Sequence, residues 1–184
     1  MGEPALASQR PDAEIVRPAK VLELAAGRPT TPLWRNEAGG LTFRIEGVRE
    51  SVVKWNPPGS SESLAEEAER LRWLSGRVPA PRVIEAGADA SGEWLLSEAV
   101  PARSAVDPRW LAEQNTLLGD DGGFAAIVDV ARVGVADRWA DLAVASLSLD
   151  WNYGPGCQST FFAAYGIEPD ERRLAYYRAL WNAE

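Results

Sequence analysis

Alternating apolar and polar positions predict two β-hairpins in the first half of the chain. LTFRI (41–45) and SVVKWN (51–56) are rich in β-branched and aromatic residues and flank the turn EGVRE. RVIEAG and EWLLSEAV flank ADASG in the same way. Short runs of this kind on either side of a turn are typical of hairpins. The four runs therefore predict one antiparallel sheet.

Between the two hairpins the apolar residues recur at helical spacing. The stripe comprises Leu64, Ala68, Leu71 and Leu74. Ser63 stands three residues before Glu66, which is the spacing of a capping box, so a helix is predicted over about residues 61–75. Glu67 falls on the apolar stripe, and a carboxylate in that place needs a partner because an unpaired buried charge costs several kcal/mol.

The later part of the chain predicts a third hairpin followed by helices. NTLL and FAAIVDV flank the turn GDDGG, and Asp137 suits the N-cap of a helix over about 138–149. QSTFFAAYG predicts a short helix that ends at Gly166, and PDERRLAYYRALWNAE predicts a last helix that starts with Pro169. The predicted division is a flexible leader (1–20), a lobe with the sheet (21–98) and a mostly helical lobe (99–184).

Composition narrows the possible partners and chemistry. The 184 residues carry a net charge of −8, which disfavours nucleic acid and suits a cationic ligand, although acidity also serves solubility. A single cysteine fits a reducing cytoplasm, and the absence of histidine excludes Ser-His-Asp triads and His-ligated zinc. The charged N-terminal segment predicts neither a signal peptide nor a membrane span.

Lys54 and Glu67 are the first candidates for a functional site. Lys54 lies in the strand VVKW, and taken alone it is a lysine that extends from an edge strand into water. A helical glutamate on the apolar face follows it by thirteen residues. Kinases use such a pair to hold an ammonium group against nucleotide phosphates.

Asp129 and Asn115 are the second pair of candidates. Asp129 ends an apolar strand, where a carboxylate is costly unless it binds a cation or accepts several hydrogen bonds. In a hairpin that turns near residues 120–121, Asn115 lies at the same open end and would add a second oxygen ligand for Mg²⁺. The alternative is that Asn115 caps a turn and Asp129 braces a loop.

The ordered set of these motifs resembles the aminoglycoside phosphotransferases, and most closely their 3′-phosphotransferase branch. The motifs are GGLTFRI, VVKW, LAEEAERLRWL, VPAPRVIEAG, WLLSEA, NTLLGDDGG, IVDVARVGVADRWADLA, FFAAYGIEPD and RLAYYRALW. The resemblance implies an α+β, protein-kinase-like fold with two lobes: an N-terminal antiparallel sheet with one helix, and a truncated, mostly helical C-terminal lobe with a β-hairpin. It also implies ATP, Mg²⁺ and a cationic aminoglycoside as ligands.

The resemblance assigns roles to individual residues. Lys54 would contact the α and β phosphates with Glu67 holding it in place, and the loop through Gly39 and Gly40 would cover the phosphates. The other implied residues are Ser97 and Ala99 at the adenine hinge, Val52 and Val128 against the adenine ring, Asn115 and Asp129 at Mg²⁺, and Arg132, Asp150 and Glu184 near the antibiotic. Asp137 and Asp141 would brace the metal and catalytic loops.

One part of the family pattern is missing. The family's catalytic loop, H-G-D-x-x-x-x-N, would end at Asn115, whereas this chain reads DPRWLAEQN there and has no aspartate at the position of the base. The segment before Asn115 is also too short for the family's helices, which indicates an internal deletion near Glu113 and Gln114. Loss of these helices is expected to expose Trp139, Leu142 and Tyr176.

Three hypotheses follow from the sequence. The chain is an antibiotic kinase with impaired turnover, a vestigial protein that binds a nucleotide without turnover, or a deletion product that folds poorly. The absent H-G-D segment separates the first from the second. Nucleotide binding separates the second from the third.

Overall fold

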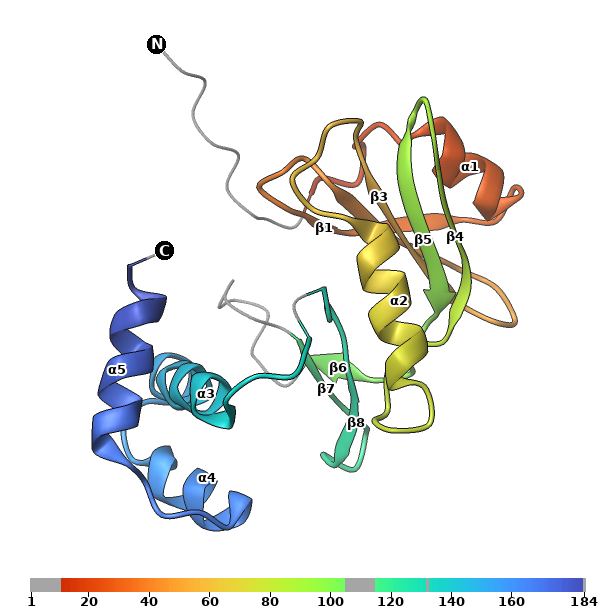
Figure 1. Cartoon of the computed structure of the whole chain (residues 1–184). Coiled ribbons are helices and arrows are strands. Elements are labelled where there is room, and N and C mark those ends of the chain that lie inside the picture. The colour runs from red at the N-terminus through yellow and green to blue at the C-terminus, as the bar shows by residue number, and fades with distance from the viewer. Residues whose placement is uncertain (1–10, 105–114, 132, 184) are drawn as a thin grey trace. The chain divides into compact units, whose positions relative to one another are not determined.

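The chain forms two compact units in a computed structural model that describes residues 11–104, 115–131 and 133–183 (Figure 1). Among these residues, the first unit contains 11–104, 115–131 and 133, and the second contains 134–183. The predicted division at residue 98 differs from this grouping, because the hairpin over residues 116–127 belongs to the unit with the sheet.

Five antiparallel strands form the sheet of the first unit, in the order β1-β2-β3-β5-β4. They are β1 (Thr30–Arg35), β2 (Leu41–Ile45), β3 (Ser51–Asn56), β4 (Val83–Asp89) and β5 (Gly92–Glu98). The predicted hairpins are confirmed as β2–β3 and β4–β5. Strand β1 is absent from the prediction because it contains Pro32, beside a shift of register, and proline is tolerated only at sheet edges and bulges.

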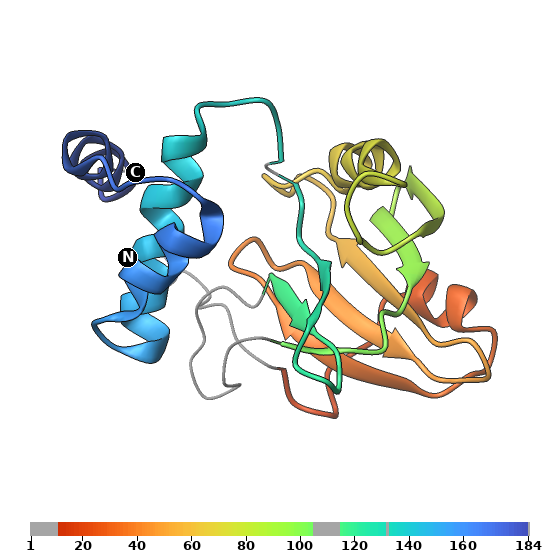
Figure 2. The ribbon, with the colours of Figure 1, turned by 90° about the horizontal axis from the view of Figure 1, so that it is seen from below.

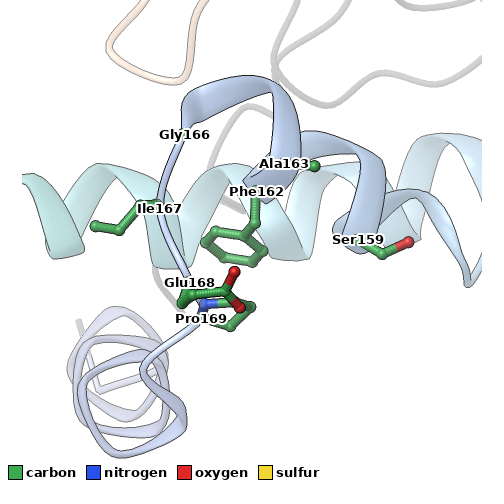
Figure 3. A pocket seen from close by; sticks show the side chains of 7 residues that line it. All are labelled: Ser159, Phe162, Ala163, Gly166, Ile167, Glu168 and Pro169. Atoms are coloured by element: carbon green, nitrogen blue, oxygen red, sulfur yellow. The ribbon is translucent and has the colours of Figure 1, made fainter.

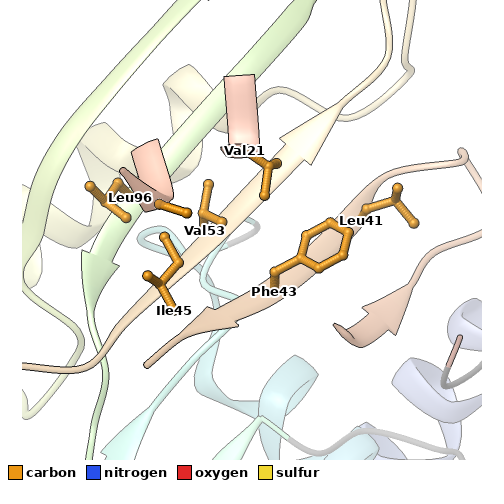
Figure 4. Packing of buried hydrophobic residues seen from close by; sticks show 7 residues of the cluster. Val21, Leu41, Phe43, Ile45, Val53 and Leu96 are labelled. Atoms are coloured by element: carbon orange, nitrogen blue, oxygen red, sulfur yellow. The ribbon is translucent and has the colours of Figure 1, made fainter. Parts of the chain in front are cut away.

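Helix α1 (Ala19–Ala25) covers one face of this sheet (Figure 4). The hydrophobic cluster between the helix and the sheet consists of Val21, Ala25, Leu41, Phe43, Ile45, Val53 and Leu96. Phe43 is fully buried, and a buried ring of this size contributes roughly 2–3 kcal/mol. Arg17, just before the helix, donates to Thr30 Oγ1 at 2.9 Å, so the end of the predicted leader is part of the first unit.

Helix α2 (Leu64–Leu74) confirms the predicted helix and packs on the opposite face. Adjacent side chains of a strand point to opposite faces, so Leu95 of β5 joins the α2 cluster while Leu96 joins the α1 cluster. Ser63 Oγ accepts from the Glu66 amide at 3.3 Å, as the capping pattern predicts. The Glu66 carboxylate pairs with an arginine on the next turn of the helix instead of closing the capping box.

A second, smaller sheet belongs to the same unit. It contains β6 (Arg103–Ser104), β7 (Thr116–Leu118) and β8 (Phe124–Ile127), and β7–β8 is the predicted third hairpin. The Ile127 amide donates to the Pro79 carbonyl at 3.0 Å. Val130, just after the hairpin, is buried in the α2 cluster. These contacts attach the hairpin to α2 and to the loop that follows it.

The second unit is a cluster of three helices, seen from below in Figure 2. They are α3 (Arg138–Tyr153), α4 (Cys157–Tyr165) and α5 (Glu171–Trp181). Gly166 ends α4 with a φ of 79°, as predicted. Helix α5 begins at Glu171 with Asp170 as its N-cap, so the predicted start at Pro169 is wrong by two residues. None of the described helices is long and apolar enough to cross a membrane.

The core of the second unit corrects one expectation. Trp139 and Leu142 are 5% and 3% exposed, because α4 and α5 cover them through Phe162 and Leu174. The prediction that the deletion exposes these two residues is therefore wrong. Tyr176 is 63% exposed, as expected.

Asp137 joins two helices of this unit. Its Oδ1 atom accepts from the Trp139 amide at 3.0 Å, which confirms it as the N-cap of α3, and its Oδ2 atom accepts from the Tyr177 hydroxyl of α5 at 3.1 Å. The Trp139 amide lowers the pKa of Asp137, burial opposes this, and the Tyr177 hydroxyl and Arg173 lower the pKa further.

We predict that Asp137→Ala lowers the melting temperature of the second unit more than Asp137→Asn, because asparagine keeps the capping acceptor. A carboxyl group with a lowered pKa stabilises the fold above its unfolded pKa of about 3.9 and loses that effect as the pH falls through the folded value. The difference between the wild type and Asp137→Asn is therefore expected to shrink between pH 5 and pH 2. Thermal unfolding followed by circular dichroism measures it, and a difference independent of pH would contradict the assignment.

Candidate functional site

Lys54 lies in β3, between β2 and β5, and not in an edge strand. It stands opposite Thr42 of β2 and Leu95 of β5. Its neighbour Val53 points into the α1 cluster, so strand alternation places the Lys54 side chain on the face that α2 covers. The interpretation of Lys54 as a lysine on an exposed edge strand is therefore wrong.

Glu67 lies on the buried stripe of α2 and is 3% exposed. Leu64, Ala68 and Leu71 surround it on that stripe and pack against the sheet. Because helical residues three and four apart share a face, the packing of these neighbours fixes the direction of the carboxylate. The sequence prediction of an inward-facing glutamate is confirmed.

The two side chains form a bidentate ion pair. Lys54 Nζ lies 2.7 Å from Glu67 Oε1 and 2.9 Å from Oε2. Burial is the largest single influence on the pKa of Lys54 and lowers it, but Glu67 and then Asp129 outweigh it, so the pKa lies above the ordinary value for lysine. Lys54 is therefore a fixed cation at neutral pH.

Asp129 completes the cluster from the segment after β8. Its Oδ1 atom accepts from Lys54 Nζ at 3.1 Å, and its side chain is 57% exposed. Its φ of 56° lies in the left-handed region, which aspartate adopts more readily than most other residues with a side chain. The next residue, Val130, is buried in the cluster beside α2. The cluster joins β3, α2 and the hairpin segment within one compact unit.

Asn115 lies at the open end of the third hairpin, as predicted. Its carbonyl accepts from the Val128 amide at 2.8 Å, which places Asn115 opposite the residue that precedes Asp129. Within the described ranges no three His, Cys, Asp or Glu side chains gather as a metal-binding group. Asn115 and Asp129 are the two residues with oxygen ligands that the family resemblance assigns to Mg²⁺.

Two of the residues assigned to adenine, Val52 and Ser97, lie on the central strands β3 and β5, whereas Ala99 follows β5 and Val128 follows β8. Val52 of β3 stands opposite Ser97 of β5, which is 8% exposed. The Ala99 amide donates to the Glu50 carbonyl at 3.0 Å. This amide, which is part of the backbone that the resemblance assigns to the adenine hinge, is therefore already bonded to the protein.

Gly39 and Gly40 lie in the turn between β1 and β2. Gly39 has a φ of 81°, which favours glycine. The amides of both glycines donate to Asn36, at 3.1 Å to its carbonyl and 2.6 Å to its Oδ1 atom. Asn36 is missing from the sequence-based set, although an asparagine just before a glycine turn commonly accepts from the backbone that follows it.

The residues assigned to the antibiotic are placed only in part. Arg132 and Glu184 lie outside the described residues. Asp150 lies in α3, where its Oδ2 atom accepts from Gln158 Nε2 at 2.5 Å. Its Oδ1 atom is buried and has no hydrogen-bond partner among the residues that the structure describes. Arg178 of α5 donates to the same Gln158, at 3.0 Å. Asp150 thus belongs to a polar network inside the second unit.

The second unit also has two shallow pockets. The first, of about 440 Å³, lies at the end of α4, where the Phe162 ring faces Pro169 (Figure 3). Its lining residues are Ser159, Phe162, Ala163, Gly166, Ile167, Glu168 and Pro169. The other, of about 450 Å³, is lined by Asp137, Asp170, Arg172, Arg173, Tyr176 and Tyr177. Neither contains a residue of the nucleotide, metal or antibiotic sets.

Comparison with known sequences identifies related proteins. The profile described as the Phosphotransferase enzyme family matches residues 34–114. An aminoglycoside 3'-phosphotransferase from Escherichia coli is 39% identical over 234 positions, which cover 78% of this chain and 86% of that protein. One from Streptomyces fradiae is 25% identical over 244 positions, which cover 78% of this chain and 91% of that protein.

These alignments are longer than the chain itself. The 184 residues leave at least 50 of the 234 positions of the Escherichia coli alignment without a counterpart. The family profile also stops at residue 114, directly before Asn115. Both observations agree with the predicted internal deletion.

Solved structures show the same fold. An aminoglycoside-3'-phosphotransferase of type VIII superposes with a TM-score of 0.69 at 25% identity, covering 83% of this chain and 92% of that one. An aminoglycoside phosphotransferase from Streptomyces rimosus, in complex with ADP and streptomycin, gives a TM-score of 0.58 at 20% identity, covering 75% and 88%.

We predict that Lys54 and Glu67 are energetically coupled. Removing one member of a buried pair leaves the other charge buried without a partner. Lys54→Met and Glu67→Gln are therefore each expected to lower the free energy of unfolding by about 3 kcal/mol. The double variant is expected to lose at least about 1 kcal/mol less than the sum. Urea denaturation of the four proteins measures this coupling.

The pair Lys20–Glu23 on α1 serves as the matched control, because it is also an ion pair at 2.8 Å but has a 68% exposed glutamate. Its coupling is expected to be weaker than that of Lys54–Glu67, since solvent screens exposed charges. Equal coupling in the two pairs would show that burial of Glu67 has no energetic consequence.

Proposed function

The chain belongs to the aminoglycoside phosphotransferase family, and on that premise we propose that the Lys54, Glu67 and Asp129 cluster binds the phosphates of ATP. The observation that carries the proposal is the bidentate pair at 2.7 and 2.9 Å, which keeps a cation at a fixed place beside an exposed carboxylate. Kinases use a strand lysine held by a helical glutamate for this purpose. The structure with ADP, from Streptomyces rimosus, supports a nucleotide ligand.

Asp129 and Asn115 are the proposed protein ligands of Mg²⁺. The residues fit such an ion because both provide oxygen atoms at one end of the hairpin, and Asp129 remains more than half exposed while bonded to Lys54. Bound Mg²⁺ would neutralise part of the phosphate charge. The left-handed φ of Asp129 agrees with a functional role, because left-handed residues other than glycine are more frequent at functional sites.

We further propose that phosphoryl transfer by this chain is impaired. No residue of the segment DPRWLAEQN matches the aspartate that orients the attacking hydroxyl in the family pattern. Glu113 precedes Asn115 by two residues, where the family's base precedes it by five, and it lies outside the described residues. Since phosphoryl transfer depends mainly on positioning and charge neutralisation, a trace of activity is compatible with this loss.

The proposed substrate class is the aminoglycosides, phosphorylated at a 3′-hydroxyl. The support consists of the names of the related proteins and a net charge of −8, which attracts polycations. Arg132, Asp150 and Glu184 remain the proposed antibiotic contacts. For Asp150, an amine of the antibiotic would have to reach a carboxylate that already accepts from Gln158.

The second candidate function is nucleotide binding without turnover. Two observations favour it: the catalytic aspartate of the family pattern is missing, and the ion pair between Lys54 and Glu67 is intact. The third hypothesis, a chain that folds poorly, predicts that nucleotide does not stabilise the protein. Two measurements distinguish the three.

We predict that MgATP stabilises the first unit. At ten times the dissociation constant, a ligand that binds only the folded state adds about 1.4 kcal/mol. Lys54→Ala and Asp129→Ala are expected to lose most of the increase in melting temperature, while Lys20→Ala, which removes the other lysine of the chain, is expected to keep it. Differential scanning fluorimetry with and without MgATP measures the increase, and equal increases in all four proteins would contradict the assignment.

We predict that the chain confers little resistance in bacteria. The minimal inhibitory concentrations of kanamycin and neomycin are expected to stay near those of an empty vector, whereas a full-length aminoglycoside 3'-phosphotransferase raises them strongly. Immunoblotting verifies that the two proteins are compared at equal expression. Resistance equal to that of the full-length enzyme would refute the proposed impairment.

A further inference from the structure

The turn between β1 and β2 is closed by the side chain of Asn36. Asn36 and Gly40 pair through the Asn36 amide and the Gly40 carbonyl at 3.0 Å, and the Gly39 amide returns to the Asn36 carbonyl at 3.1 Å. The Gly40 amide donates to Asn36 Oδ1 at 2.6 Å. Both glycine amides of the loop that the family resemblance places over the phosphates are therefore bonded to one residue.

The same side chain ties the turn to the start of α2. Asn36 Nδ2 donates to Glu62 Oε2 at 2.6 Å. Glu62 stands just before the N-cap of α2, and its carbonyl accepts from Asn56 Nδ2 at 3.0 Å. Asn56, at the end of β3, is 2% exposed. Asn36 therefore connects the turn to the helix that carries Glu67.

Gly40 packs against these two asparagines. A Cβ atom at position 40 would lie 2.2 Å from Asn56 Oδ1 and 2.8 Å from Asn36 Nδ2. Such separations are far below van der Waals contact, so a larger residue would displace both side chains. The requirement for glycine at position 40 thus follows from the packing of Asn36 and Asn56.

We propose that the Asn36 side chain is a latch that competes with nucleotide phosphates for the Gly40 amide in the β1–β2 turn. The inference rests on the proposed function, since it concerns the same phosphate site. An N–H group makes one strong hydrogen bond, so a phosphate oxygen can reach the Gly40 amide only after Asn36 Oδ1 leaves it. The apparent affinity for a ligand is the intrinsic affinity multiplied by the fraction of molecules in the binding-competent conformation. The latch therefore lowers affinity for phosphates and not for adenosine.

The carboxylate of Glu62 offers a second explanation of weak phosphate binding, through charge repulsion. Glu62→Gln separates the two, because glutamine removes the charge and keeps an oxygen acceptor for Asn36 Nδ2. Asn36→Ala removes the latch and leaves the charge of Glu62 in place.

Isothermal titration calorimetry of adenosine, MgADP and MgATP with the full chain tests the proposal. Asn36→Ala is expected to bind MgATP about fivefold more tightly than the wild type, which corresponds to one ordinary hydrogen bond, with adenosine affinity unchanged. Glu62→Gln is expected to stay within about twofold of the wild type. Unchanged or weaker MgATP binding by Asn36→Ala, an equal gain for adenosine, or a full gain in Glu62→Gln would each overturn the latch.

Amide hydrogen exchange provides a readout that needs no ligand. The Gly40 amide is expected to be protected in the wild type and in Glu62→Gln, and to lose at least about fivefold in protection in Asn36→Ala. A wild type that binds no nucleotide contradicts the proposed function, and rapid exchange of its Gly40 amide overturns the latch separately.

Discussion

A carboxylate buried at 3% exposure, that of Glu67, constrains the whole first unit. It requires a cation, and the residue that provides one is Lys54, from the strand flanked by β2 and β5. The pair thereby fixes how α2 crosses the sheet. The ammonium group retains one further contact, to Asp129, and through it the third hairpin joins the cluster. A structural requirement for pairing thus brings together the groups that a phosphate site needs.

Sequence patterns predict this cluster because its parts obey short-range rules. Strand alternation directs Lys54 away from Val53, and helical spacing places Glu67 between Leu64 and Leu71. The α1 helix and β1 escape prediction because one has only seven residues and the other contains a proline. The burial of Trp139 also escapes prediction, since it depends on how α4 and α5 pack on α3 after the deletion.

The backbone amides around the cluster are constrained by hydrogen bonds within the protein. The Gly40 amide is bonded to Asn36 and the Ala99 amide to Glu50. Backbone donors in a compact unit seldom stay unpaired, so these two amides, which lie in segments that the family resemblance assigns to a nucleotide, already have partners within the protein. A sequence motif identifies such groups without revealing this competition. The proposed function therefore depends on what a nucleotide displaces as well as on what it contacts.

The most direct test of the account uses the two lysines of the chain, Lys20 and Lys54. An acyl-phosphate derivative of ATP transfers its acyl group to a lysine amine that lies beside the bound phosphates. Mass spectrometry of the digested protein then identifies the modified residue. The account predicts labelling of Lys54 that excess MgATP suppresses. Labelling of Lys20 alone, or labelling of Lys54 that MgATP leaves unchanged, would contradict it.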